Sequence, residues 1–117
     1  MAKIIIVEGK YDKNKLLEIL DEQVEIICTY GTLGEEKIEE IILPYELEDV
    51  YVFVDADESG NKIRKLIKQS LPNARHLYTR RMYGQVSSTP VEYLAKVLSD
   101  AHFIIKSDLT DEDNLPI

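Results

Sequence analysis

Two apolar runs that each end in acidic residues constrain this chain more than any other feature of its sequence. Residues 4–7 (Ile-Ile-Ile-Val) lead directly into Glu8, and residues 51–54 (Tyr-Val-Phe-Val) lead into Asp55 and Asp57. Short, strongly apolar runs are typical of parallel strands that are buried on both faces. The carboxyl ends of such strands meet at one edge of a sheet, where three carboxylates repel one another unless a divalent cation lies among them. The pattern therefore predicts a functional site.

Apolar runs alternate with helical patterns along the whole chain. We expect strands at residues 4–7, 24–28, 50–54 and 74–79. A short fifth strand at 103–105 is an alternative that the sequence leaves undecided. Helices are expected between the strands, with starts or caps at Asp12, Gly34, Ser59 or Gly60, and Ser88 or Thr89. This alternation predicts an α/β fold in which helices cover both faces of a mostly parallel, four-stranded sheet.

Length and hydropathy indicate one small domain. We expect it to occupy residues 1–106, followed by an acidic, loosely ordered tail at 107–117. No apolar run approaches the roughly 18 residues that a membrane span needs, and the first run is too short for a signal peptide. We therefore expect a cytoplasmic protein that does not contact a membrane. Cys28 lies within an apolar run and is expected to act as a small hydrophobic residue.

Charge is distributed unevenly along the chain. The net charge is -8, yet residues 59–91 contain no Asp or Glu and hold seven of the fourteen Lys and Arg residues. The negative total argues against avid, non-specific binding to nucleic acid, because that affinity comes from cations that displace counterions from phosphates. A basic segment beside an acidic strand end favours a surface that faces phosphates. The alternative is a solvated helix face whose composition has no function.

The acids themselves indicate which cation they would hold. Asp55 and Asp57 are two positions apart, so on an extended chain both project to the same side. Carboxylate oxygens without a nearby histidine or thiolate suit Mg²⁺, with Mn²⁺ as a substitute, better than zinc. Mg²⁺ keeps waters that a phosphate can displace, so phosphoryl transfer is the implied chemistry. Gly9 and Gly60 beside these acids let a backbone or a phosphate approach closely.

Taken together, the two acidic motifs resemble those of the Toprim domain, the catalytic module of several topoisomerases, primases and nucleases. The motifs read Val-Glu-Gly-Lys-Tyr-Asp at 7–12 and Asp-Ala-Asp-Glu-Ser-Gly at 55–60, and Gly31 stands where the family often places a glycine. The resemblance extends over residues 3–79 and implies a Rossmann-like fold. It also implies that Asp55 and Asp57 bind Mg²⁺ and that Glu8 is a metal ligand or the general acid/base.

Residues 55–65 resemble most closely the ribosomal-RNA maturation ribonucleases, in which a basic helix follows the acidic motif. Those enzymes and the bacterial primases imply Mg²⁺-dependent phosphoryl or nucleotidyl transfer on nucleic acid, with nuclease-like cleavage of RNA or DNA as the main expectation. The ribonucleases carry a further RNA-binding domain, and this chain ends where that domain would begin. We therefore expect a stand-alone small Toprim protein, and the ribosomal substrate does not carry over.

Further residues are candidates for substrate binding or support. Those expected to contact substrate phosphates are Lys10, Arg64, Arg80 and Arg81. For Arg80 and Arg81 the reason is that a guanidinium group matches phosphate oxygens in a bidentate manner. Solvated side chains are the alternative for Lys10, Arg80 and Arg81. Supporting roles are expected for Gly9, Asp12, Gly31 and Gly60. Asp12 matches the family motif, yet an N-cap explains it equally well.

Two other functions stay open from the sequence. A receiver-like phosphoacceptor domain would place Glu8, Asp55, Thr79 and Lys106 near its own functional positions, although its paired acids normally follow the first strand. A non-catalytic adaptor module would keep the metal site and bind nucleic acid weakly, with a protein partner. A homodimer through Tyr45 and Tyr51 also stays open, as does the question of whether the chain turns over a substrate.

Overall fold

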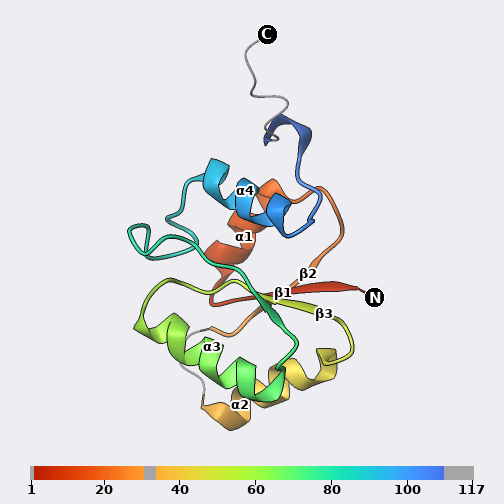
Figure 1. The fold of residues 1–117 in the computed structure, drawn as a ribbon, viewed down its shortest axis with the longest axis vertical. Helices are drawn as coiled ribbons and strands as arrows, with labels where there is room; N and C mark the ends of the chain where they lie inside the picture. Colours follow the sequence, from red (N-terminus) through yellow and green to blue (C-terminus); the bar gives the residue numbers. More distant parts are fainter. Residues whose placement is uncertain (1, 31–33, 110–117) are drawn as a thin grey trace.

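A single parallel sheet lies at the centre of the molecule. The computed structural model describes residues 2–30 and 34–109 (Figure 1). The four strands are β1 (Lys3–Val7), β2 (Glu25–Cys28), β3 (Asp49–Val52) and β4 (Arg75–His76), in the order β2-β1-β3-β4. Every pair of neighbouring strands is parallel, so the predicted α/β fold class is confirmed.

Helices cover both faces of the sheet, as Figure 1 shows. One face carries α1 (Lys10–Ile19) and α4 (Val91–Asp100), which contact each other, and the other face carries α2 (Glu35–Ile42) and α3 (Glu58–Ser70). Two short 3₁₀ helices, η1 (Leu43–Tyr45) and η2 (Ser107–Leu109), follow α2 and α4 respectively. None of the helices in the described ranges is both long and apolar enough to span a membrane.

The sheet separates two hydrophobic cores, which explains why β1 is apolar at nearly every position. Ile5 and Val7 pack into the core beneath α1 and α4, whereas Ile4 and Ile6 pack into the core beneath α2 and α3. Alternate side chains of a strand project to opposite faces, so a strand between two helical layers needs apolar residues throughout. This burial fixes the register of β1 and hence the position of the residue that follows it.

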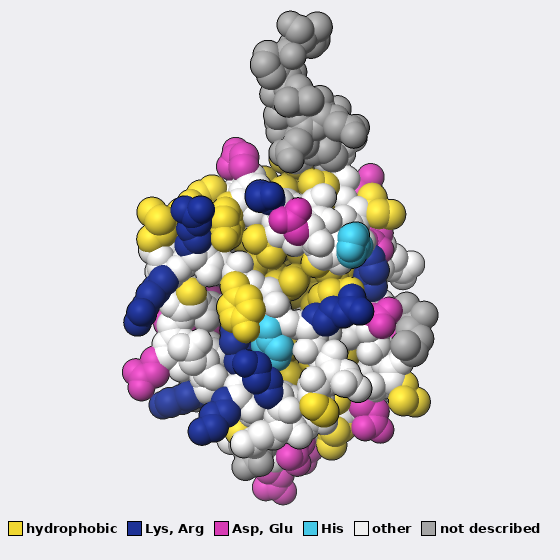
Figure 2. Space-filling view, viewed as in Figure 1, with side chains coloured by type: hydrophobic (Ala, Val, Ile, Leu, Met, Phe, Trp, Pro, Cys, Tyr) yellow, Lys and Arg dark blue, Asp and Glu magenta, His cyan; other side chains and the backbone are white. Residues whose placement is uncertain are grey.

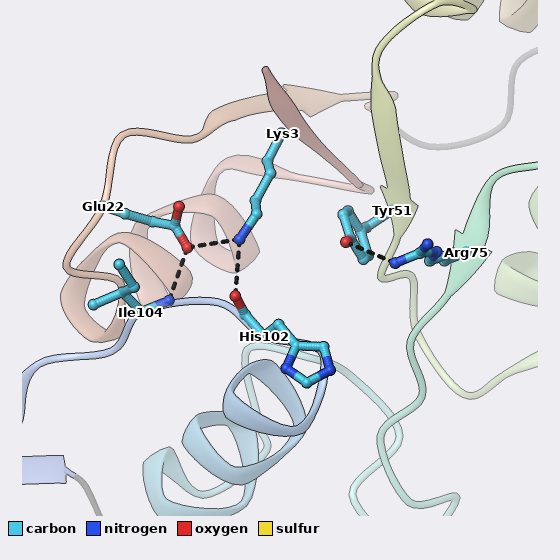
Figure 3. Close-up of polar contacts among 6 residues, drawn as sticks. All are labelled: Lys3, Glu22, Tyr51, Arg75, His102 and Ile104. Atoms are coloured by element: carbon cyan, nitrogen blue, oxygen red, sulfur yellow. Dashed lines mark hydrogen bonds and ion pairs between the residues drawn. The ribbon is translucent and has the colours of Figure 1, made fainter. Parts of the chain in front are cut away.

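The segment at 103–105 is not a fifth strand. Ile105 makes only an isolated antiparallel bridge with Leu20. A polar cluster holds the segment in place: Glu22 Oε1 accepts hydrogen bonds from Lys3 Nζ at 3.1 Å and from the Ile104 N–H at 2.8 Å (Figure 3). Two backbone hydrogen bonds, from the Asp21 N–H to the Ile104 carbonyl at 2.8 Å and from the Lys106 N–H to the Ile19 carbonyl at 2.9 Å, complete its attachment.

The boundaries of several other elements differ from the sequence prediction. β4 contains two residues rather than the six predicted at 74–79. The helix α1 begins at Lys10 with Gly9 as its N-cap, because Asp12 accepts the Gly9 N–H from within the first turn. Pro90 is the N-cap of α4, in place of Ser88 or Thr89. Of the predicted tail at 107–117, the structure describes η2, and residues 110–117 lie outside the described residues.

Candidate active site

The carboxylates of Glu8 and Asp55 meet at the carboxyl edge of the sheet. Glu8 directly follows β1, and β1 pairs with β3 in a register that sets Ile6 opposite Val52. The pairing continues as the Phe53 N–H donates to the Ile6 carbonyl at 2.8 Å. Next along the chain, the Asp55 N–H donates to Glu8 Oε2 at 2.7 Å. Parallel strand pairing therefore brings together two residues that are 47 positions apart.

Asp55 is the most perturbed acid of the site. Its side chain is buried, with 8% of the residue exposed, and its Oδ1 accepts the Val86 N–H at 2.8 Å. Burial is the main cause that raises the pKa of Asp55 to about 6, and the carboxylates of Glu8 and Asp57 act in the same direction. The Val86 N–H opposes this shift. A carboxylate in such surroundings gains most from a nearby cation.

Asp57 is the N-cap of α3. Its Oδ1 accepts the Gly60 N–H at 2.7 Å, and its side chain is exposed. Gly60 itself lies against the end of β3: a Cβ atom at this position would be 2.0 Å from the carbonyl oxygen of Asp55. Only glycine permits this approach, and the approach sets the first turn of α3 beside both aspartates.

The loop at 80–88 closes over the buried acids. Besides the bond from Val86 to Asp55, the Ser87 N–H donates to Asp12 Oδ1 at 2.9 Å, and the Gly84 carbonyl accepts the Ala56 N–H at 2.7 Å. Burial, followed by the charge of Asp55, raises the pKa of Asp12. Gly84 has φ +69°, a conformation that favours glycine. Asp12 therefore supports both the start of α1 and this loop.

An open pocket of about 340 Å³ adjoins these acids. It is lined by Glu8, Gly9, Tyr11, Asp12, Tyr30, Asp55, Gln85 and Ser87. Four of these residues come from positions 8–12 and two from the loop at 80–88, so the pocket lies where the sheet edge meets the loop. Gly31, which was predicted to support this site, lies outside the described residues.

The donor set at the sheet edge fits a divalent cation through two of its acids. Across residues 2–30 and 34–109, no group of three His, Cys, Asp or Glu side chains has a geometry that could hold a metal ion. Glu8 and Asp55 nevertheless supply two adjacent hard carboxylates, and the charge of Asp57 reaches Asp55. Mg²⁺ is commonly bound through one or two carboxylates and keeps several waters, so the pair fits Mg²⁺. The set of three predicted ligands stays a prediction.

Three of the four predicted phosphate-binding cations are exposed near this edge. Lys10 lies on the first turn of α1, with its Nζ 5.5 Å from the centroid of the Tyr11 ring. Arg80 and Arg81 begin the loop that covers Asp55, and the Arg80 guanidinium is 5.4 Å from the Tyr93 ring centroid. These positions leave the three cations accessible to a ligand, and their contact with phosphate stays a prediction.

Arg64 is placed differently, because its guanidinium is buried and 5% of the residue is exposed. Its Nη2 donates to the carbonyls of Val54 at 3.2 Å and Leu77 at 2.6 Å, and its Nη1 lies 3.5 Å from the Val52 carbonyl. Burial lowers its pKa. Arg64 thus joins the ends of β3 and β4, and we do not propose it as a direct phosphate ligand.

Sequence reasoning missed the backbone donors of the site. The N–H groups of Val86 and Ser87 bind Asp55 and Asp12, yet neither residue type carries a signal for this. The only indication was the length of the loop at 80–88 and its glycine, which are typical of a functional segment.

Comparison with known proteins identifies the family. Residues 3–84 match the Toprim domain. The chain is 43% identical over 102 residues to the uncharacterized protein YusF of Bacillus subtilis (strain 168), a match covering 87% of this chain and 70% of YusF. It is 30% identical over 84 residues to Ribonuclease M5 of Fusobacterium nucleatum, covering 72% of this chain and 46% of that enzyme. The chain thus spans less than half of this Ribonuclease M5.

A solved structure agrees with this result. The small TOPRIM domain protein from Bacillus stearothermophilus superposes with a TM-score of 0.85 and is 43% identical, with 93% of this chain and 92% of that chain covered.

The environment of Thr79 argues against the receiver-like alternative. A receiver-like phosphoacceptor domain would use this hydroxyl at its site, whereas here the hydroxyl is buried against the Thr89 hydroxyl at 2.6 Å. On the match over residues 3–84 and this structural likeness, the chain belongs to the Toprim domain family.

Proposed function

We propose that this protein catalyses metal-dependent phosphoryl transfer on nucleic acid, with cleavage as the reaction. The contact of the Glu8 carboxylate with Asp55 at the carboxyl edge of the sheet carries the proposal. Two adjacent acids, one of them buried with a raised pKa, are costly to keep unless a cation binds them. Mg²⁺, with Mn²⁺ as a substitute, is the proposed cofactor.

Each residue has a distinct proposed role. Asp55 and Glu8 would hold the cation. The exposed carboxylate of Asp57 would add negative charge on the solvent side of the cation. When bound, the metal would polarise the scissile phosphate and neutralise developing charge. Glu8 keeps one carboxylate oxygen bonded to the Asp55 N–H, which orients its other oxygen either toward the cation or, as the alternative role, for proton transfer to or from a sugar oxygen. Arg80 and Arg81 would bind the flanking phosphates.

The relatives support the class of reaction. The proteins named Ribonuclease M5 share the Toprim region with this chain, and the match covers 46% of the Fusobacterium nucleatum enzyme. We therefore propose nuclease-like processing of nucleic acid, without assigning a particular RNA or DNA as the substrate.

A cleavage assay on four substrates tests the proposal. Single-stranded RNA, hairpin RNA, single-stranded DNA and duplex DNA would be incubated with Mg²⁺, Mn²⁺ or EDTA. We expect cleavage of at least one substrate with metal and none with EDTA. Glu8→Gln and Asp55→Asn should lower the rate at least ~100-fold, in line with the loss of metal or acid/base catalysis. Asp49→Asn, an exposed acid at the opposite end of β3, is the matched control and should retain full activity.

The alternatives give different results in the same experiment. A chain that cleaves nothing, but whose melting temperature rises with Mg²⁺, would contradict catalysis and support the metal-binding adaptor module. Covalent labelling of Asp55 by acetyl phosphate would instead support the phosphoacceptor function. Cleavage that survives in Asp55→Asn would show that the activity comes from another site or from a contaminating nuclease.

A further inference from the structure

A groove along the outer side of α3 lies apart from the pocket at Glu8 and Asp55. It has a volume of about 450 Å³ and is lined by Asn61, Arg64, Lys65, Lys68, Gln69 and Tyr78. Figure 2 shows Lys and Arg side chains gathered over α3 on this face of the molecule. We refer to these six residues as the α3 groove.

Tyr78 gives the α3 groove an aromatic surface. The residue is 54% exposed. The Arg64 guanidinium lies 4.1 Å from the ring centroid, and three backbone carbonyls hold that guanidinium in turn. The ring is therefore supported from one side by a group that three carbonyls hold in place, while the residue stays more than half exposed to solvent.

The two lysines of the α3 groove are not paired with acids. Lys65 and Lys68 are exposed, and among the described residues neither forms an ion pair. No Asp or Glu occurs between residues 59 and 91. A concentration of cations without counter-charge attracts a polyanion, even on a protein whose net charge is -8.

The α3 groove also points toward the acidic site. Asn61 lies in the first turn of α3, directly after the Asp57 cap, and its N–H donates to the Asp57 carbonyl at 3.0 Å. Positions 61, 65 and 68 lie on one side of a helix and extend over roughly 10 Å at about 1.5 Å per residue. A chain bound along this side would end beside the aspartates.

We propose that the α3 groove binds a single-stranded segment of nucleic acid, with one unpaired base stacked on Tyr78 and the adjoining phosphates on Lys65 and Lys68. A single strand is required because the bases of a duplex are already stacked and cannot reach the ring. In this arrangement, the groove presents the neighbouring phosphodiester to Glu8 and Asp55. That last step rests on the proposed function, whereas the binding does not.

A tryptophan reporter tests the stacking directly. The chain contains no tryptophan, so Tyr78→Trp supplies the sole indole, and a stacked base should quench its fluorescence. The titration would use an unstructured RNA of about 12 nucleotides, and the same sequence as DNA, with EDTA present to prevent cleavage. Leu47→Trp, on an exposed residue outside the groove, is the control and should not be quenched. Equal quenching in the two variants, or no quenching in Tyr78→Trp, would overturn the proposal.

Affinity measurements in EDTA test the groove without a reporter. Tyr78→Leu should weaken binding about 10-fold to 100-fold, whereas Tyr78→Phe should bind as the wild type does, because stacking needs the ring and not the hydroxyl. Lys65→Gln and Lys68→Gln should each lower the dependence of log K on log salt by about 0.7. Lys62→Gln, on the same helix but outside the groove, should leave it unchanged. An equal affinity for Tyr78→Leu, or for a blunt duplex, would contradict the proposal.

These results separate the two proposals. Quenching of the indole in Tyr78→Trp without any cleavage would leave the α3 groove supported and contradict the catalytic function. Metal-dependent cleavage that Tyr78→Leu does not affect, together with an unquenched indole in Tyr78→Trp, would contradict the groove and leave the catalytic function supported.

Discussion

The Glu8 carboxylate accepts a hydrogen bond of 2.7 Å from the backbone N–H of Asp55, and this bond joins the ends of the two central strands. It places one acid within contact of another acid that is already buried. Without a cation, the site therefore carries a cost in repulsion, which substitution of its acids should make measurable.

Asp55→Asn should make the metal-free protein more stable. The amide can still accept the Val86 N–H, while the substitution removes a buried negative charge and its repulsion by Glu8 and Asp57, which together raise the pKa of Asp55 to about 6. We expect a gain of roughly 1 kcal/mol near neutral pH, since solvent screens part of that repulsion. Mg²⁺ should raise the melting temperature of the wild type and not of the variant. Calorimetry with and without Mg²⁺ checks this, and a lower melting temperature for metal-free Asp55→Asn would contradict it.

Asp57→Asn gives a second test of the same site. Asparagine caps a helix about as well as aspartate does, so α3 should keep its stability in the absence of metal. If Asp57 adds charge to the cation site, the increase in melting temperature caused by Mg²⁺ should be reduced. An increase equal to that of the wild type would exclude Asp57 from metal binding.

Gly60→Ala should disrupt the site more than any other small substitution. The added Cβ would lie 2.0 Å from the Asp55 carbonyl oxygen, so α3 or the end of β3 must shift. We expect a loss of about 1–3 kcal/mol in the free energy of unfolding, typical of overpacking. Gly34→Ala, where no atom lies within 4 Å of the new Cβ, is the control and should cost much less. Chemical denaturation of both variants provides the measurement.

Asp12→Ala should loosen the loop at 80–88. It removes the acceptor for the Gly9 and Ser87 N–H groups and should cost about 1–2 kcal/mol, as the loss of a helix cap does. Trypsin cleaves after Arg80 and Arg81, so limited proteolysis at these two bonds should become faster. Asp21→Ala, at an exposed acid beyond α1, serves as the control. Unchanged cleavage in Asp12→Ala would show that Val86 and Gly84 hold the loop without Asp12.

His76 should make stability depend on pH. Arg64 Nη1 can only donate, so the His76 Nδ1 at 3.0 Å accepts and the ring is neutral. Burial, with the charges of Arg64 and Lys68, lowers the pKa of His76 from 6.5 to about 4. Because the folded pKa lies below the unfolded one, stability is full above the unfolded value and is lost as the pH falls toward the folded value.

Melting curves of the wild type and of His76→Gln between about pH 7.5 and about pH 5 isolate this effect, because Asp55, whose pKa is raised to about 6, is present in both proteins. The wild type should lose more stability over this range than His76→Gln, which cannot gain the proton. The only other histidine, His102, is exposed and has φ +69°, so His102→Asn is a control that tolerates the backbone conformation. Parallel curves for the wild type and His76→Gln would exclude the ring as the titrating group.

The sequence predicted the central part of the fold well because burial on both faces leaves a clear signal. The apolar runs before Glu8 and Asp55 required two buried parallel strands, and these strands lie side by side. The sequence predicted β4 as six residues, because the alternation at 74–79 resembles a strand. In the structure, the ladder ends at His76, where Arg64 takes the carbonyl of Leu77.

The site was predictable only in part. Side-chain acids at strand ends carry a signal, whereas the N–H groups of Val86 and Ser87 do not, because any residue other than proline can donate from its backbone. Arg64 was predicted to contact substrate because it lies in a basic segment. Its burial depends on the path of α3 across the sheet, and composition says nothing about that path.

The parallel arrangement separates the two rims of the sheet. Every strand ends at the rim that holds Glu8 and Asp55, while the turn with Leu47, a residue 78% exposed, lies at the start of β3 on the far rim. Extra sequence grafted into that turn would therefore enlarge the protein without disturbing its chemistry, which makes residue 47 a natural attachment point for a tag, a tether or a fused module.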